Sequence, residues 1–161
     1  MVSDMKKKKV TIRKALEQTE YPIVYKKFSK MFKVIKKSER RFFIKLLKVF
    51  CTEIKNNEQI YYASASQLNL NQRGLILLLN NRLLLVHSKE RSKIIHFDQI
   101  KFSKISEIDF ERDDSDMSDE KYGSLFLKVA RKNMGSRNYN IRGILKEDLP
   151  EVTEFIKIKM S

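Results

Sequence analysis

The sequence predicts an α+β fold in which basic helices are followed by a small antiparallel β-barrel or sandwich and one closing helix. Two observations lead to this prediction. Hydrophobic residues recur at helical spacing up to about residue 55, and short extended apolar runs with polar turns replace them from Asn56 onward. With 161 residues, 42% of them hydrophobic, the chain has the size of one domain with one core.

The first third is predicted to form three helices. A short helix contains Ile12, and a second follows from Pro22, because proline lacks the N–H that stays unpaired in the first turn of a helix. A third begins at Ser38, a good N-cap residue, and runs to about Lys55. The apolar sides of the second and third helices are Val24, Phe28, Met31, Phe32 and Ile35, and Phe43, Leu46, Leu47, Phe50 and Ile54.

Seven extended runs are predicted to be strands, and a polar loop is expected after the first. They cover residues 60–63, 75–79, 83–86, 94–97, 105–111, 125–130 and 139–141. Asn80 and Asn81 separate the second and third runs, and both can take the positive φ of a type I′ hairpin turn. Asp148 and Glu151 then resemble a capping box at the start of the closing helix.

The strand region from residue 73 resembles a known family. Arg73 and Gly74, followed by the apolar hairpin, look like the Gly-led first-hairpin signature of the YokE-like bacterial PH (pleckstrin-homology-like) family. Residues 95–100, residues 139–143 and the C-terminal helix continue the resemblance. It implies an α+β, PH-like seven-stranded antiparallel β-barrel over 58–161, capped by the C-terminal helix. The basic helical segment over 1–57, which precedes it, lies outside the resemblance and is predicted from the helical spacing alone. The resemblance also implies a binding or assembly scaffold without a catalytic site.

The resemblance departs from one PH property. Eukaryotic PH domains that hold phosphoinositides generally place several Lys and Arg on the first two strands and their connecting loop, because several phosphates need several cationic donors. Residues 64–73 of this chain contain one basic residue, Arg73. A specific phosphoinositide pocket is therefore not expected at this place.

Positive charge is concentrated in the helical region. Residues 1–57 hold 17 Lys and Arg against 5 Asp and Glu, whereas residues 58–161 hold 17 against 15. Most of the net charge of +14 thus lies in the first third. Such an asymmetry indicates either an anionic partner or a solvated helical face.

No catalytic or metal-binding pattern is recognised. His96 and Asp98 lie two residues apart in a predicted strand, which fits a strand edge and turn better than a catalytic pair. Two histidines and one cysteine make no recognisable zinc set, and none of the four glycines belongs to a G-x-x-x-x-G-K phosphate loop. The sequence therefore predicts a protein that is not an enzyme and has no cofactor or metal.

An acidic run covers residues 109–120. Asp109 and Glu120 have the spacing of a calcium loop's ends, but Asp114 stands where such a loop needs glycine. An exposed loop between two strands is expected instead.

The chain is predicted to be cytoplasmic. The single Cys51 allows no internal disulfide and fits a buried thiol in a reducing compartment. The first residues lack the apolar core of a secretory signal, and the longest helix-like apolar run, 42–51, is too short to span a bilayer.

The hairpin strands carry one further expectation. A strand with one solvated face alternates apolar and polar residues, yet residues 75–79 and 83–86 are all apolar. Both faces should therefore be buried. The third helix is expected to cover the outer face, with a second copy of the protein as the alternative.

Two function classes follow. In the first, the protein is a non-catalytic binding or adaptor module that contacts a protein partner or itself. In the second, the N-terminal helices bind an anionic membrane or nucleic acid. The residues assigned to this binding are Lys26, Lys30, Lys33 and Lys37 on the second helix and Arg41, Lys45 and Lys48 on the third.

Overall fold

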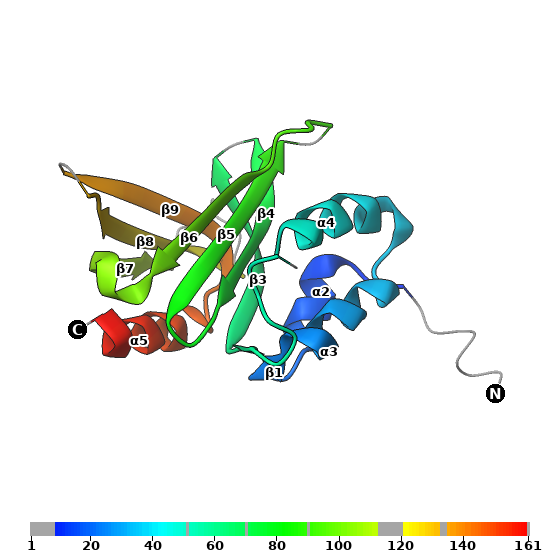
Figure 1. The fold of residues 1–161 in the computed structure, drawn as a ribbon, viewed down its shortest axis with the longest axis horizontal. Coiled ribbons are helices and arrows are strands. Elements are labelled where there is room, and N and C mark those ends of the chain that lie inside the picture. Colours follow the sequence, from blue (N-terminus) through cyan, green and yellow to red (C-terminus); the bar gives the residue numbers. More distant parts are fainter. Residues whose placement is uncertain are drawn as a thin grey trace.

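A seven-stranded antiparallel sheet curls into a half-barrel in the computed structural model, which describes residues 9–50, 52–69, 71–89, 91–112, 121–132 and 135–160 (Figure 1). The strand order is β6-β5-β4-β3-β9-β8-β7. The strands are β3 (Tyr62–Asn69), β4 (Gln72–Leu78), β5 (Arg82–Lys89), β6 (His96–Lys101), β7 (Ile105–Glu111), β8 (Tyr122–Ala130) and β9 (Ser136–Leu145). The closing helix α5 (Leu149–Met160) follows. The predicted α+β, PH-like order of seven strands and one helix is confirmed.

Several strand bounds differ from the prediction. β3 continues to Asn69, through residues expected to form a polar loop, because the hydroxyls of Ser64 and Ser66 find hydrogen-bond partners inside the fold. β6 begins at His96 rather than at Ile94, and β9 extends well beyond 139–141 on both sides. Cys51 and most of the acidic run (113–120) lie outside the described residues.

The hairpin turn after β4 is not the predicted type I′ turn. Neither Asn80 nor Asn81 has a positive φ. The Leu79 N–H donates to the Arg82 carbonyl, and the Asn81 carbonyl accepts from Phe102 N–H at 3.2 Å. A contact with the segment after β6 thus helps to determine the conformation of this turn. The two asparagines alone could not predict that contact.

The N-terminal region forms a helical layer of several short elements. These are α2 (Ile12–Glu17), β1 (Ile23–Val24), α3 (Tyr25–Lys30), the 3₁₀ turn η1 (Met31–Val34) and α4 (Lys37–Phe50). The prediction of one continuous second helix from Pro22 is wrong. β1 instead pairs with β2 (Gln59–Ile60), and the helix ends at Lys30 because Val10 joins the backbone after it. Val10 N–H donates to the Val34 carbonyl, and Val10 accepts from Lys36 N–H.

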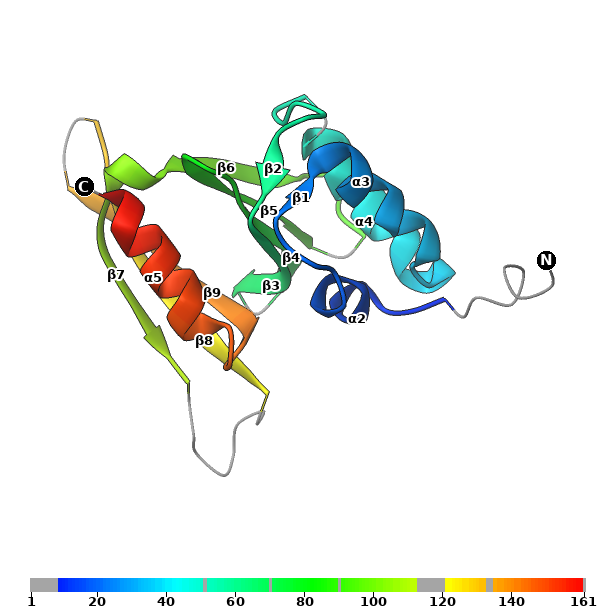
Figure 2. The ribbon, with the colours of Figure 1, turned by 90° about the horizontal axis from the view of Figure 1, so that it is seen from below.

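Two hydrophobic cores lie on the two faces of the β4–β5 hairpin. On the outer face, Leu77 and Leu84 pack with residues of α2, α3 and α4. On the inner face, Ile76 and Leu85 pack with β8, β9 and α5. The expectation that both faces are buried is confirmed, and the cover consists of the whole helical layer rather than of the third helix alone (Figure 2).

One ion pair connects the helical region to the hairpin, and a second connects the hairpin to the segment just before β2. Arg73 Nη2 lies 3.4 Å from Glu39 Oε2 of α4, and Arg82 Nη1 lies 2.6 Å from Glu58 Oε2. Burial of the Glu58 carboxyl opposes its ionisation. The hydrogen bonds from Arg82 and from the Lys55 N–H, together with the positive charges of Arg82 and Lys55, outweigh burial and lower the pKa of Glu58. These contacts and the outer core fix the orientation of the helical layer on the sheet.

Candidate binding surfaces and a pocket

The outward side of the helical layer carries an excess of positive charge. Residues 21–50 contain ten Lys and Arg but one carboxylate, Glu39. That carboxylate is turned inward, where Oε1 accepts from Ile12 N–H at 2.9 Å and Oε2 pairs with Arg73. We use the term basic helical surface for the exposed side chains of Lys26, Lys27, Lys30, Lys33, Lys36, Lys37, Arg41 and Lys48.

Six of the seven basic residues assigned from the sequence belong to this surface. Lys37 lies on α4 rather than on the predicted second helix. The seventh, Lys45, was expected to face solvent, but it is only partly exposed. Its Nζ donates to the Ser92 carbonyl at 2.8 Å and lies 5.0 Å from the centre of the Phe42 ring. Lys45 therefore connects α4 to the β5–β6 loop instead of extending into solvent.

The β5–β6 loop, which Lys45 connects to α4, presents an exposed apolar side chain. Ile94 is 67% exposed, and Arg91 and Lys93 next to it are exposed as well. The loop is held in place because Ser88 Oγ donates to the Ile94 carbonyl at 2.8 Å and Ile94 N–H donates to Ser92 Oγ. Sequence reasoning missed this feature, since the run of Ile94 and Ile95 before His96 resembled the start of a strand.

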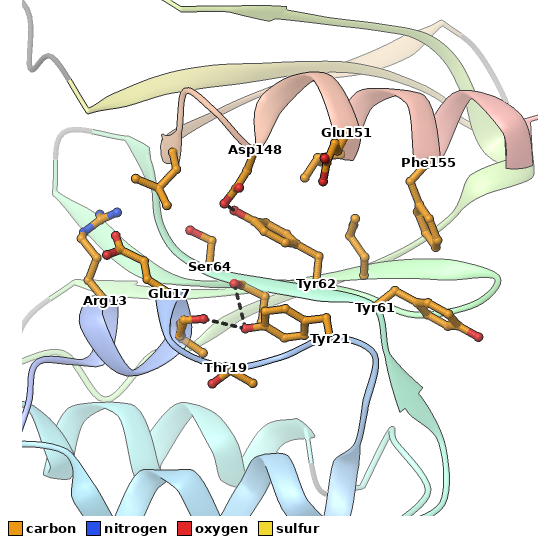
Figure 3. A pocket seen from close by; sticks show the side chains of 15 residues that line it. Arg13, Glu17, Thr19, Tyr21, Tyr61, Tyr62, Ser64, Asp148, Glu151 and Phe155 are labelled. Atoms are coloured by element: carbon orange, nitrogen blue, oxygen red, sulfur yellow. Dashed lines mark hydrogen bonds between the residues drawn. The ribbon is translucent and has the colours of Figure 1, made fainter.

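A cavity of about 420 Å³ opens where β3 and β9 diverge (Figure 3). Gln67 and Arg142 form the one register pair between the two strands in the described residues. Beside it, Gly143 has φ +89°, and its carbonyl accepts from Arg13 Nη1 at 2.6 Å. The separated strand ends leave a space that α5 covers on one side and residues 13–21 cover on the other.

The pocket is lined by tyrosines and carboxylates. Tyr21 Oη donates to the carbonyls of Leu16 (3.1 Å) and Ala63 (3.2 Å), and Tyr62 Oη donates to Asp148 Oδ2 (2.8 Å). Burial raises the pKa of Tyr21. Burial, followed by the hydrogen bond to Asp148, raises the pKa of Tyr62. Both phenols therefore stay protonated near neutral pH and act as donors.

The predicted capping-box residues line this pocket too. In Figure 3, Asp148, just before α5, and Glu151 on α5 project toward β3, while Tyr61 and Phe155 lie at the other end of the cavity. The rings of Tyr61 and Phe155 lie 5.4 Å apart. Sequence reasoning could not assemble this site, because its residues come from three distant segments.

A buried Ser–His pair lies elsewhere in the barrel. Ser66 Oγ is 2.8 Å from His87 Nε2, and the two residues flank Gly74 in the register of β3, β4 and β5. Ser66 is 2% exposed and His87 is 0% exposed, so no substrate reaches them. The fully buried His87 Nδ1 has no partner among the described atoms. The pair is therefore a structural contact.

The two catalytic candidates weighed from the sequence, His96 and Asp98, lie in the first half of β6. Asp98 pairs with Arg137 at 3.6 Å, and His96 is exposed at the strand start. In the part of the chain that the structure describes, no group of three or more His, Cys, Asp or Glu is placed to hold a metal ion. Within the same residues, no helix combines the length and apolar composition needed to cross a membrane.

The curled sheet with its closing helix defines the class of PH-like domains, which are generally binding modules. Residues 54–158 match the family model of the bacterial PH domain, and the chain belongs to this family. It is 25% identical, over 146 residues, to the SPbeta prophage-derived uncharacterized protein YokE of Bacillus subtilis strain 168. That match covers 86% of this chain and 88% of YokE. It therefore extends into the helical region, since residues 54–161 make up only about two thirds of the chain.

Two solved structures have a similar fold. The hSac2 domain from the human phosphoinositide phosphatase Sac2 superimposes with a TM-score of 0.51 at 14% identity, over 77% of this chain and 84% of that one. A DUF1696-family protein with a pleckstrin-homology domain from Shewanella loihica PV-4 gives a TM-score of 0.47 at 14% identity, over 74% of this chain and 93% of that one. At this identity the hSac2 similarity concerns the fold alone.

Proposed function

We propose that this bacterial PH protein is a non-catalytic module that binds anionic membranes peripherally, through the basic helical surface and the β5–β6 loop. The observation that supports the proposal most directly is the exposed Ile94, flanked by Arg91 and Lys93 and tied to α4 by Lys45. An apolar residue among cations matches the chemistry of a membrane interface, where acyl chains lie beneath anionic headgroups. The cytoplasmic leaflet is such a surface.

The magnitudes fit reversible binding. Each Lys or Arg near an anionic leaflet contributes about 1 kcal/mol, and full burial of an isoleucine side chain contributes roughly 1.5–3 kcal/mol. Four basic contacts together with Ile94 then give roughly 5–7 kcal/mol, which corresponds to dissociation constants between micromolar and millimolar. Because most of this free energy is electrostatic, binding should weaken as salt rises.

A membrane is favoured over nucleic acid by the kind of exposed apolar residue. Proteins that bind single strands stack bases on accessible aromatic rings. Among the described residues, the large hydrophobic side chains that are well exposed are Ile94 and Ile158, which are both aliphatic. Phe42 of α4 is partly buried, and both Lys45 and Arg73 lie over its ring.

The helical region (1–57) then has two roles in the proposal. It covers the outer face of the PH-like domain (58–161), and it carries the membrane-binding charge. The adaptor function, in which the barrel or a strand edge contacts a protein, is the alternative. It predicts that charge reversal on the helices leaves partner binding unchanged.

Co-sedimentation with vesicles tests the proposal. Vesicles of equal parts phosphatidylcholine and phosphatidylglycerol should retain the protein at low salt, and vesicles of phosphatidylcholine alone should not. Charge reversal should abolish retention in the variant Lys26→Glu, Lys30→Glu, Lys33→Glu and Arg41→Glu. The matched control reverses four exposed cations of the barrel, in the variant Lys101→Glu, Lys104→Glu, Arg131→Glu and Lys132→Glu. Equal loss in both variants would mean that only net charge matters.

The contribution of the apolar side chain to membrane binding is tested by a pair of matched substitutions. Ile94→Ser should weaken vesicle binding about tenfold or more, because burial of that side chain is lost. Ile158→Ser removes the other exposed isoleucine, which is 68% exposed on α5, and should have no effect. If the protein binds duplex DNA more tightly than vesicles at the same salt, and Ile94→Ser changes neither, the membrane proposal is wrong.

A further inference from the structure

We propose that the cavity between β3, α5 and residues 13–21 binds an organic cation, an ammonium or guanidinium group on an apolar stem. The site lies where β9 leaves β3 and is built from residues other than those of the basic helical surface. Its volume of about 420 Å³ falls in the range of small-molecule pockets. The class of ligand follows from three features of its walls.

The first feature is local negative charge in a strongly basic protein. The lining contains Glu17, Asp148 and Glu151 but one cation, Arg13. Arg13 is already used, because its Nη1 donates to the Gly143 carbonyl and its guanidinium lies 4.0 Å from the centre of the Tyr122 ring. An anionic ligand would meet three carboxylates here, so the charge balance selects a cation.

The second feature is that the two carboxylates on the α5 side have no basic partner. Within the part of the chain that the structure describes, no Lys or Arg lies at ion-pair distance from Asp148 or Glu151. Asp148 accepts one hydrogen bond, from Tyr62 to Oδ2, and this leaves acceptor capacity on its carboxylate. The N-terminus of α5 stabilises these charges without neutralising them. A ligand N–H would form charge-assisted hydrogen bonds with them.

The third feature is an aromatic wall suited to a cation's stem. Tyr21, Tyr61, Tyr62 and Phe155 line the cavity, with Tyr21 and Tyr62 at a centroid distance of 5.8 Å. The Phe155 ring already has the ammonium of Lys159 5.1 Å from its centre. Aromatic faces attract cations, and they also bury the methylene groups that carry them.

Two sources could supply such a group, a free amine or a Lys or Arg side chain of a partner. NMR titration of the full chain with n-pentylamine, agmatine and a capped Ala-Lys-Ala peptide distinguishes them. Tighter binding of the peptide indicates a protein ligand, and tighter binding of the free amines indicates a small molecule. Dissociation constants in the millimolar range are expected, since ligands of so few atoms gain little binding free energy. n-Pentanol, which has the same stem without charge, should bind at least tenfold more weakly.

Variants of α5 provide the controls. Asp148→Asn keeps an oxygen for Tyr62 Oη, removes the charge and should weaken amine binding about tenfold. Glu151→Gln, on an exposed residue that cannot disturb the core, should weaken it less. Glu154→Gln lies on the same helix outside the lining and should bind as the unmodified chain does. Shifts should centre on Tyr21, Tyr62 and α5.

Three results would overturn the proposal: pentanol binding as tightly as pentylamine, Asp148→Asn and Glu151→Gln both binding like the unmodified chain, or no shifts at the cavity with any probe. These outcomes are independent of membrane binding. The fourfold charge reversal on α3, η1 and α4 should leave amine binding unchanged, so the two proposals can fail separately.

Discussion

Removal of the helical layer should expose an apolar surface that the sheet cannot present to water. In a chain beginning at Asn56, the outer face of the β4–β5 hairpin loses its cover. The side chains of this face are fully buried in the intact fold, each with 0% of its surface exposed. They are Leu75, Leu77, Leu79, Leu84 and Val86. At roughly 1.5–3 kcal/mol per buried side chain, the exposed face costs roughly 8–15 kcal/mol. That is comparable to the whole stability of a typical domain.

The truncated chain is therefore expected to self-associate or to be less soluble than the full chain. Gel filtration with light scattering measures this directly. The cause can be isolated, because Leu77 and Leu84 face each other in the register on the outer side. In the full chain, Leu77→Thr with Leu84→Thr should lower the free energy of unfolding by several kcal/mol, since both side chains leave the core. In the truncated chain, the same pair should restore solubility.

The inner face supplies the matched control. Ile76 and Leu85 are the adjacent register pair, and they face the barrel core in both chains. Ile76→Thr with Leu85→Thr should therefore destabilise the full and the truncated chain alike. The reasoning is refuted if the truncated chain is monomeric and as heat-stable as the full one, or if the outer pair of substitutions destabilises both chains equally.

Two further predictions concern the inner side of the hairpin. Burial lowers the pKa of His87 to about 3, against about 6.5 unfolded, so its contribution to stability is complete above pH 6.5 and is lost as pH falls toward 3. Measured by urea unfolding, the free energy of unfolding should fall by about 1.4 kcal/mol per pH unit between these two values, and His87→Gln should make this fall less steep. If the pH dependence is the same in His87→Gln, other groups cause it. Gly74→Ala should cost on the order of 3 kcal/mol, because a Cβ would overlap the Val86 carbonyl oxygen. Gly135→Ala, at φ +70° with no neighbouring atoms, should cost only about 1 kcal/mol, and equal losses would contradict the overlap.

The sequence predicts the sheet well because burial leaves a local pattern there. Residues 75–79 and 83–86 are apolar throughout, and the structure indeed buries both of their faces. The order of seven strands and a closing helix could be read in the same way. The bounds of β3, β6 and β9 were predicted less well, and in β3 the reason is that Ser64 and Ser66 are polar side chains that are nevertheless buried. Their hydroxyls bond to Ala65 and His87, which sequence alone does not reveal.

The helical layer was predicted less well because its boundaries depend on distant contacts. The apolar spacing through Phe28, Phe32 and Ile35 fits one helix, and all three residues are buried. The chain nevertheless turns at η1, where Ile35 forms a bridge with Val10. Likewise, Lys45 has the spacing of a solvent-facing residue, yet its ammonium is bound by the Ser92 carbonyl. In both cases a partner more than twenty residues away decides the outcome.

The cavity illustrates why a site can be invisible in a sequence whose fold is readable. Asp148 and Glu151 have the spacing of a capping box, which predicts a local role for both at the start of the helix, although the Asp148 N–H donates to the Leu145 carbonyl. Their place in the wall of the cavity depends on two other parts of the fold. Gly143 takes a positive φ next to the pairing of β9 with β3, where the two strands separate. Tyr21 contacts β3 at the Ala63 carbonyl, on the side that β9 has left. Carboxylates placed to begin a helix thereby come to face an aromatic wall. The sequence pattern predicts a single role for these carboxylates, whereas the described part of the fold places them beside a cavity with no Lys or Arg at ion-pair distance.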